Sequence, residues 1–66
     1  MLKVEVEQET DGRFIAEVAA LPGVMAYGQS RQEAVTKVEA LALRTLADRI
    51  ERGERTPDLP QIFSAI

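Results

Sequence analysis

Residues 11–34, DGRFIAEVAALPGVMAYGQSRQEA, contain two predicted chain reversals and the predicted start of a helix. Asp11-Gly12 supplies the positive φ that tight hairpin turns need. Leu21-Pro22-Gly23 predicts a second reversal, since proline restricts φ and glycine adopts conformations that other residues avoid. Ser30 and Glu33 form a capping box, in which both side chains accept hydrogen bonds from free backbone N–H groups at a helix start. The stretch therefore predicts strands joined by tight turns and followed by a helix.

Alternating polar and apolar residues on both sides of Asp11-Gly12 predict two paired strands, over residues 2–8 and 13–19. Each strand has one apolar face, and these faces comprise Leu2, Val4, Val6, Phe14, Ala16 and Val18. The opposite faces contain the charged residues Lys3, Glu5, Glu7, Arg13 and Glu17, and Ile15 is an apolar residue among them. A short apolar run at 24–27, ending at Gly28, predicts a third strand. We expect three antiparallel strands in chain order, with one buried face and one wet face.

The helix is predicted to begin after the Ser30 cap, to run to about Arg52 and to stop at Gly53, because glycine suits a helix end. Its apolar residues occupy about half of the helix circumference, more than the stripe of about 100° that one sheet face requires. They are Ala34, Val35, Val38, Leu41, Ala42, Leu43, Leu46 and Ile50. Part of this apolar surface should therefore meet something other than the sheet.

The expected architecture is an α+β fold, in which one face of a three-stranded antiparallel sheet is covered by one long helix. Residues 1–66 are expected to form a single domain, with residues 55–66 as an extended C-terminal tail that contains two prolines and an apolar end. The predicted core residues are Val4, Phe14, Val35, Val38, Ala42 and Leu46.

The composition predicts a protein that works by association. A chain of 66 residues buries only about 60% of its unfolded surface, and with no Cys and no His it lacks disulfides and the usual zinc ligands. The apolar fraction of 45% is high for so small an interior, which favours a homodimer or a dimer-based tetramer. The residues expected at the contact between copies are Leu43, Ile50, Ile62, Phe63 and Ile66.

The charge pattern indicates the kind of partner. Eight basic and eleven acidic residues give a net charge of −3, which is unlike the basic surface of a nucleic-acid-binding protein and favours basic partners. The sequence has no signal-peptide pattern and no run near the ~20 apolar residues that span a bilayer. We therefore expect a soluble, cytoplasmic protein without direct contact to DNA or membranes.

The sequence offers few residues for catalysis. Without His or Cys, the carboxylates of the first hairpin could cluster around Mg²⁺, but strand alternation alone explains where they lie. Ser30 heads a helix in a capping box, and no His exists to activate it as a nucleophile. We expect a protein that is not an enzyme and binds no metal or cofactor; a metal-dependent nuclease is the least favoured alternative.

The same residues resemble the HicB-like antitoxin family when they are taken in order. The resemblance rests on an Asp-Gly hairpin with an aromatic residue two positions later, a Leu-Pro-Gly turn, a Gly before a Ser cap, and Glu-Ala at the helix start. In this chain these are Asp11-Gly12, Phe14, Leu21-Pro22-Gly23, Gly28, Ser30 and Glu33-Ala34. A Gly53-to-Pro60 segment is similar to the family's Gly-x-x-x-Pro-x-Pro ending.

The resemblance implies a partial RNase H-like fold that binds and masks a small HicA-like mRNA-cleaving toxin. Because such a toxin must present positive charge to RNA, we expect the carboxylates of Asp11 and Glu17 and the ring of Tyr27 to contact it. The chain ends at Ile66, so we expect none of the operator-binding extension found in many members. The alternative is a stand-alone oligomeric regulatory or structural protein of HicB-like fold without a toxin.

Overall fold

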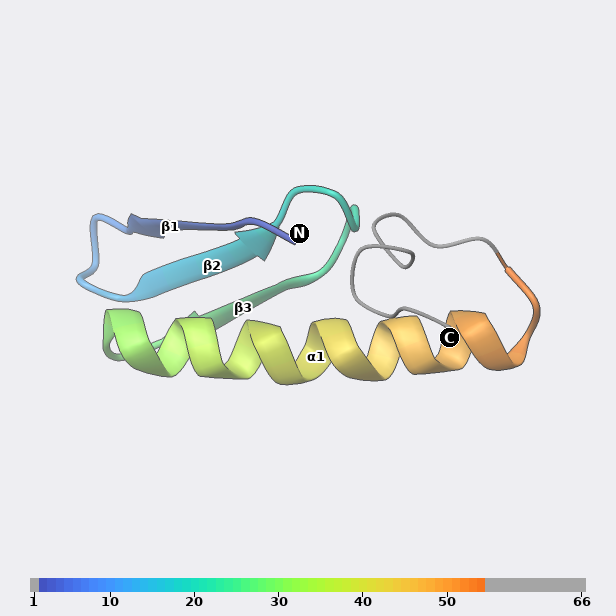
Figure 1. Cartoon of the computed structure of the whole chain (residues 1–66). Helices are drawn as coiled ribbons and strands as arrows, with labels where there is room; N and C mark the ends of the chain where they lie inside the picture. The colour runs from blue at the N-terminus through green and yellow to red at the C-terminus, as the bar shows by residue number, and fades with distance from the viewer. Residues whose placement is uncertain (1, 55–66) are drawn as a thin grey trace.

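The computed structural model describes residues 2–54, which form three strands and one helix. β1 (Val4–Gln8), β2 (Phe14–Val18) and β3 (Met25–Gly28) precede α1 (Arg31–Glu51) in the chain. The strands form one antiparallel sheet in the order β1-β2-β3, and α1 lies along one face of it (Figure 1). The predicted α+β fold is confirmed.

β1 and β2 are shorter than the alternation predicted, and β3 lies one residue later than its predicted range. For β2 the reason is turn chemistry at both of its ends. In the first turn Gly12 has φ 94°, and its N–H donates to the carbonyl oxygen of Glu9 at 3.0 Å. The N–H of Arg13 donates to the carboxylate of Asp11 at 3.0 Å instead of joining the ladder, so β2 begins one residue later than expected. At its other end the N–H of Leu21 donates to the carbonyl oxygen of Val18 at 3.0 Å, which turns the chain away from β1.

The helix starts and stops where the sequence predicted. The Ser30 hydroxyl accepts from the N–H of Glu33 at 3.0 Å. The Glu33 carboxylate accepts from the N–H of Gln29 at 2.8 Å, one residue before the expected partner. At the C-terminal end Gly53 has φ 76°, and its N–H donates to the carbonyl oxygen of Ile50 at 3.0 Å. The N–H of Glu54 also donates to the carbonyl oxygen of Arg49 at 2.9 Å. These two hydrogen bonds together define a Schellman motif.

The core lies between the sheet and the helix. Its buried residues are Ala16, Val18, Leu21, Val24, Ala34, Val38, Ala42 and Leu46. Three residues predicted to be core, Val4, Phe14 and Val35, are only partly buried and pack against this cluster. The reason is geometric: α1 packs mainly on β3 and β2 and least on β1, so the margins of the apolar face remain partly exposed.

The helix is also longer than the sheet that it covers. Figure 1 shows its C-terminal half continuing past the ends of the strands. Two large apolar side chains of this half, Leu43 and Ile50, are 66% and 43% exposed. No helix within residues 2–54 is long and apolar enough to cross a membrane.

Candidate functional site

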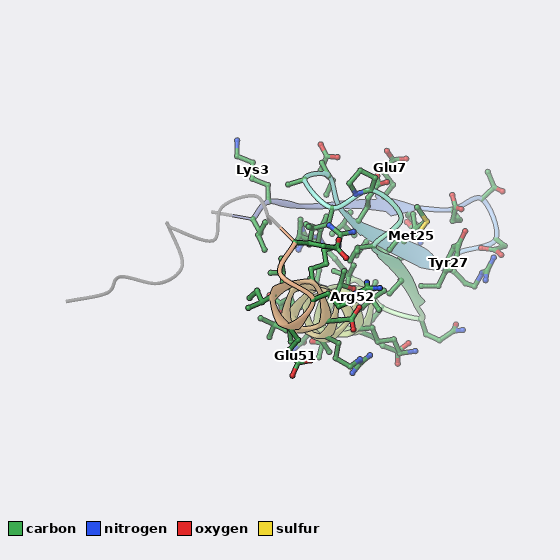
Figure 2. All side chains as sticks on the ribbon, turned by 90° about the vertical axis from the view of Figure 1, so that its right-hand side faces the viewer. Lys3, Glu7, Met25, Tyr27, Glu51 and Arg52 are labelled. Carbon is green, nitrogen blue, oxygen red and sulfur yellow. The ribbon has the colours of Figure 1, made fainter. Side chains whose placement is uncertain are left out.

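The sheet face opposite α1 is the main candidate for a binding surface. Within the described residues no helix or strand covers it. The antiparallel register aligns its side chains in two rows across the three strands. One row contains Glu5, Glu17 and Met25, and the other contains Glu7, Ile15 and Tyr27. We call these six residues the open face; Glu7, Met25 and Tyr27 are seen on the side of the sheet away from α1 in Figure 2.

The open face combines a negatively charged part, on β1 and β2, with an apolar part, on β2 and β3. Glu5 and Glu17 lie directly opposite each other in the β1–β2 ladder, an arrangement that destabilises a sheet because the two charges repel. A hollow of about 240 Å³ lies over this region, and it is lined by Glu5, Glu7, Glu9, Ile15, Glu17 and Met25. The apolar part is accessible, since Met25 is 41% and Tyr27 42% exposed. The surface therefore offers both carboxylates and apolar anchors to a partner.

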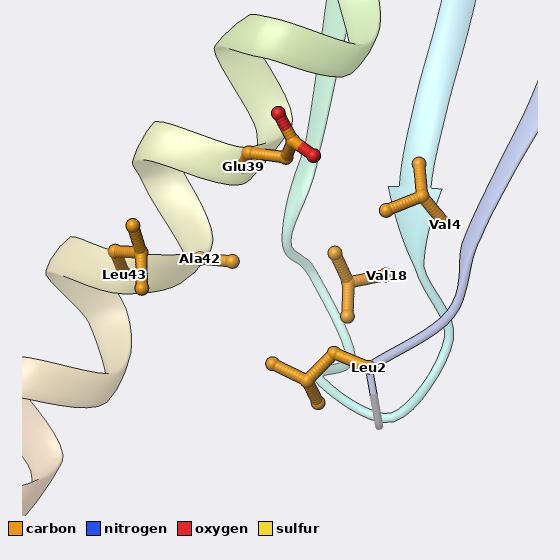
Figure 3. Close-up of a pocket in the computed structure, with 6 residues that line it drawn as sticks. All are labelled: Leu2, Val4, Val18, Glu39, Ala42 and Leu43. Atoms are coloured by element: carbon orange, nitrogen blue, oxygen red, sulfur yellow. The ribbon is translucent and has the colours of Figure 1, made fainter. Parts of the chain in front are cut away.

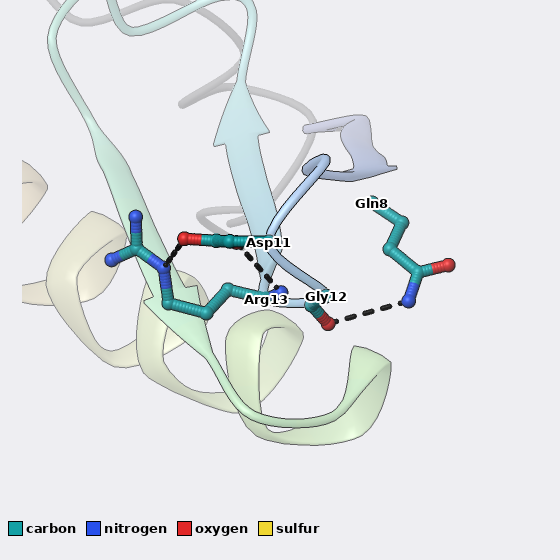
Figure 4. Close-up of polar contacts among 4 residues, drawn as sticks. All are labelled: Gln8, Asp11, Gly12 and Arg13. Atoms are coloured by element: carbon teal, nitrogen blue, oxygen red, sulfur yellow. Dashed lines mark hydrogen bonds and ion pairs between the residues drawn. The ribbon is translucent and has the colours of Figure 1, made fainter.

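A polar cluster at the hairpin end of the sheet organises the edge of the open face. The Nε of Arg13 donates to Asp11 at 2.8 Å, and its guanidinium carbon lies 4.5 Å from the centre of the Tyr27 ring. This distance is typical of a cation–π contact. On the other side of the turn, Gln8 donates to the carbonyl oxygen of Gly12 at 3.3 Å (Figure 4). The cluster ties the β1–β2 turn to β3.

The environment of Asp11 keeps its carboxylate charged. The backbone N–H of Arg13 and then the Arg13 guanidinium hold the pKa of Asp11 below its ordinary value. Both contacts lie inside the turn. Asp11 therefore orients Arg13 over Tyr27, in addition to any contact with a partner.

The structure brings two of the three predicted contact residues together. Asp11 and Tyr27 meet through Arg13, whereas Glu17 lies in the other row of the open face, beside Glu5. Sequence reasoning did not select Glu5, Glu7, Ile15, Met25 or Arg13 as contact residues. For Ile15 a signal was present, because it is the apolar residue on the wet face of the second strand. Met25 and Arg13 depend on cross-strand register, which the sequence pattern does not specify.

The residues expected at a contact between copies are described only in part. Leu43 and Ile50 are exposed on the helix, whereas Ile62, Phe63 and Ile66 lie outside the described residues.

In the part of the chain that the structure describes, no three acidic side chains are arranged to hold a metal ion. The Ser30 hydroxyl accepts from a helix N–H, so it serves as a cap.

Comparison of the chain with protein-family models, with curated proteins and with solved structures found no match. The fold class rests on the strands and helix described above. The HicB-like resemblance stays a prediction that rests on the order of turn and cap residues in the sequence.

Proposed function

We propose that this protein is a HicB-like antitoxin that binds and masks a small, basic, HicA-like mRNA-cleaving toxin with its open face. The observation that carries the proposal is the composition of that face, in which carboxylates on β1 and β2 lie beside the apolar side chains of Ile15, Met25 and Tyr27. A protein that binds RNA presents positive charge to the phosphate backbone. A negative surface attracts such a protein and competes with phosphate for its cationic groups.

The two kinds of residue would act differently in such a complex. Exposed carboxylates mainly raise the association rate and set orientation, whereas buried aromatic and apolar side chains supply most of the affinity. The ring of Tyr27, held by Arg13 on one side, is already oriented and loses little freedom on binding. The proposal therefore assigns steering to Glu5, Glu7 and Glu17. It assigns anchoring to Ile15, Met25 and Tyr27.

The test is co-expression with the nearest small basic gene product, followed by pull-down and a growth-rescue assay. Glu17→Lys should weaken the complex at least tenfold, about 1.4 kcal/mol, because it reverses a charge in the middle of the open face. The matched control is Glu51→Lys, which makes the same charge change on the helix, far from the sheet (Figure 2). The control should bind and rescue as the unchanged chain does.

Equal loss of binding in both variants would mean that net charge alone matters and would count against the open face. If no basic protein co-purifies, or growth is rescued without this chain, the antitoxin proposal fails. A stand-alone oligomeric protein of the same fold would then be the better account.

A further inference from the structure

A second surface feature, independent of the open face, lies on the helix side of the sheet. It is an apolar groove of about 320 Å³ between α1 and β1, and Figure 3 shows the side chains on its two walls. Its lining residues are Leu2, Val4, Val18, Glu39, Ala42 and Leu43. Only Glu39 is charged. A cavity of ~150 Å³ accepts a benzene ring, so the groove has room for about two large apolar side chains.

The groove exists because one helix is too narrow for the sheet. Three strands at about 4.8 Å spacing present a face wider than the roughly 10 Å diameter of a helix. α1 packs mainly on β3 and β2, which leaves the inner side of β1 only partly covered. Leu2, Val4 and Val6 are accordingly only partly buried. The groove is thus the part of the apolar sheet face, along β1, that α1 does not cover.

After α1 the chain turns toward the side of the helix on which the sheet and the groove lie. The Schellman motif at Gly53 turns it off the helix axis. Figure 1 shows the last described residues bending from the helix end toward the side on which the sheet lies. Between this exit and the groove, Leu43 and Ile50 are exposed and lie seven residues apart, which places them on one side of the helix. Together they form an exposed apolar strip on α1 that runs from the groove toward the C-terminal end of the helix.

The residues after Glu54 have the composition to fill the groove. Twelve residues follow it, with Pro57 and Pro60 first and the apolar residues toward the end. Leu59, Ile62, Phe63 and Ile66 are spaced i, i+3, i+4, i+7, a spacing that would place four apolar side chains on one side of a helical segment.

The length of this segment is sufficient for a return within the same chain. From Leu43 to Glu51 the helix rises only about 12 Å, whereas the five residues from Glu54 to Leu59 alone can span about 16 Å when extended. A short tether also gives an effective concentration in the millimolar range, about a hundredfold above a second copy at tens of micromolar. The chain's own segment should therefore occupy the groove before another copy does.

We infer that residues 59–66 fold back along α1 and fill the groove between α1 and β1 of the same chain. Ile62 and Phe63 enter beside Leu43, and the segment completes the layer that one helix leaves unfinished. The residues that were predicted at a contact between copies then pack against one another within one chain. They are Leu43, Ile50, Ile62, Phe63 and Ile66. The open face, on the other side of the sheet, stays free for a partner.

Disulfide trapping tests this inference, because the chain contains no cysteine of its own. Glu39→Cys at the groove rim is combined with Ser64→Cys, which leaves every apolar anchor in place. The matched control combines Arg44→Cys with Ser64→Cys. Arg44 is exposed, lies closer to the chain exit, and points away from the groove lining, since it follows Leu43 by 100° around the helix.

Under mild oxidation the Glu39→Cys pair should form an intramolecular disulfide at least about tenfold faster than the control pair, since docking raises the local concentration of the two sulfurs. Intact mass spectrometry should give a monomer at every protein concentration. Adding Ile62→Ser and Phe63→Ser should reduce the rate to that of the control pair, with circular dichroism monitoring the fold.

Two outcomes overturn the inference. Covalent dimers that increase with protein concentration would mean that a second copy fills the groove. Equal rates for the Glu39→Cys and Arg44→Cys pairs would mean that the segment does not dock. Both comparisons remain valid even if the serine variants fail to fold.

Discussion

Gly28 shows how one residue sets the position of the helix on the sheet. It is the last residue of β3 and is buried. A Cβ at this position would overlap the backbone nitrogen of Ala34 and would come within 3.0 Å of its Cα. Backbone atoms of a helix cannot move aside as a flexible side chain can. Only glycine therefore allows the first turn of α1 to lie so close to the strand.

We predict that Gly28→Ala lowers the free energy of unfolding by about 2 kcal/mol, the usual cost of an added group in a tightly packed place. Gln29→Ala, at the exposed neighbouring position, should change it by less than about 0.5 kcal/mol. Urea unfolding followed by circular dichroism measures both values. Equal effects of the two substitutions would contradict the close packing of β3 against the helix.

At the scale of the element, the start of α1 depends on one carboxylate with two roles. Glu33 accepts from the N–H of Gln29 at 2.8 Å and lies 3.5 Å from the Nζ of Lys37. The hydrogen bond from Gln29 and, secondarily, the charge of Lys37 hold the pKa of Glu33 below its ordinary value of 4.5. A carboxyl whose pKa is lower in the folded chain stabilises the fold when it is ionised.

We predict that this contribution is fully present above the pKa of Glu33 in the unfolded chain, near 4.5, and is lost as the pH falls through the lower pKa of the folded chain. Glu33→Gln keeps a hydrogen-bond acceptor at the cap but removes the charge. The melting temperature of this variant should therefore fall less between pH 7 and pH 3 than that of the unchanged chain. The control, Glu51→Gln, removes a carboxylate at the other end of α1. If Glu33→Gln has the same pH dependence as the unchanged chain, the assigned role of Glu33 is wrong.

At the scale of the whole molecule, the open face concentrates negative charge at a cost in stability. Glu5 and Glu17 are cross-strand neighbours, and like charges in this position destabilise a sheet. The chain already carries a net charge of −3. A surface shaped only for stability would pair a carboxylate there with Lys or Arg. This conflict is typical of residues that serve binding.

We predict that Glu17→Gln raises the free energy of unfolding by a few tenths of a kcal/mol, because it removes the repulsion with Glu5. The gain should shrink at about 1 M salt, which screens exposed charges. Urea unfolding at low and high salt gives both numbers. If Glu17→Gln lowers the free energy of unfolding, or raises it equally at low and high salt, repulsion between Glu5 and Glu17 does not destabilise the sheet. In the proposed complex the same substitution should slow association with the basic partner.

The local features of this protein could be predicted from its sequence. The Asp11-Gly12 turn, the Ser30 cap and the Gly53 stop all lie at the predicted positions. Each depends on hydrogen bonds and dihedral preferences among residues at most five apart, so a short stretch of sequence contains the necessary information. The alternation of the strands likewise predicted the wet side of Glu17 and the core side of Val18.

The position of the helix across the sheet and the contacts on the open face depend on tertiary packing and could not be predicted from the sequence. α1 lies toward β3, so Val4 is only partly buried and a groove opens beside β1. Register placed Glu5 opposite Glu17 and brought Arg13 over Tyr27. These contacts join residues that are distant in the chain, and they depend on how a narrow helix packs on a wider sheet. No local pattern contains that information.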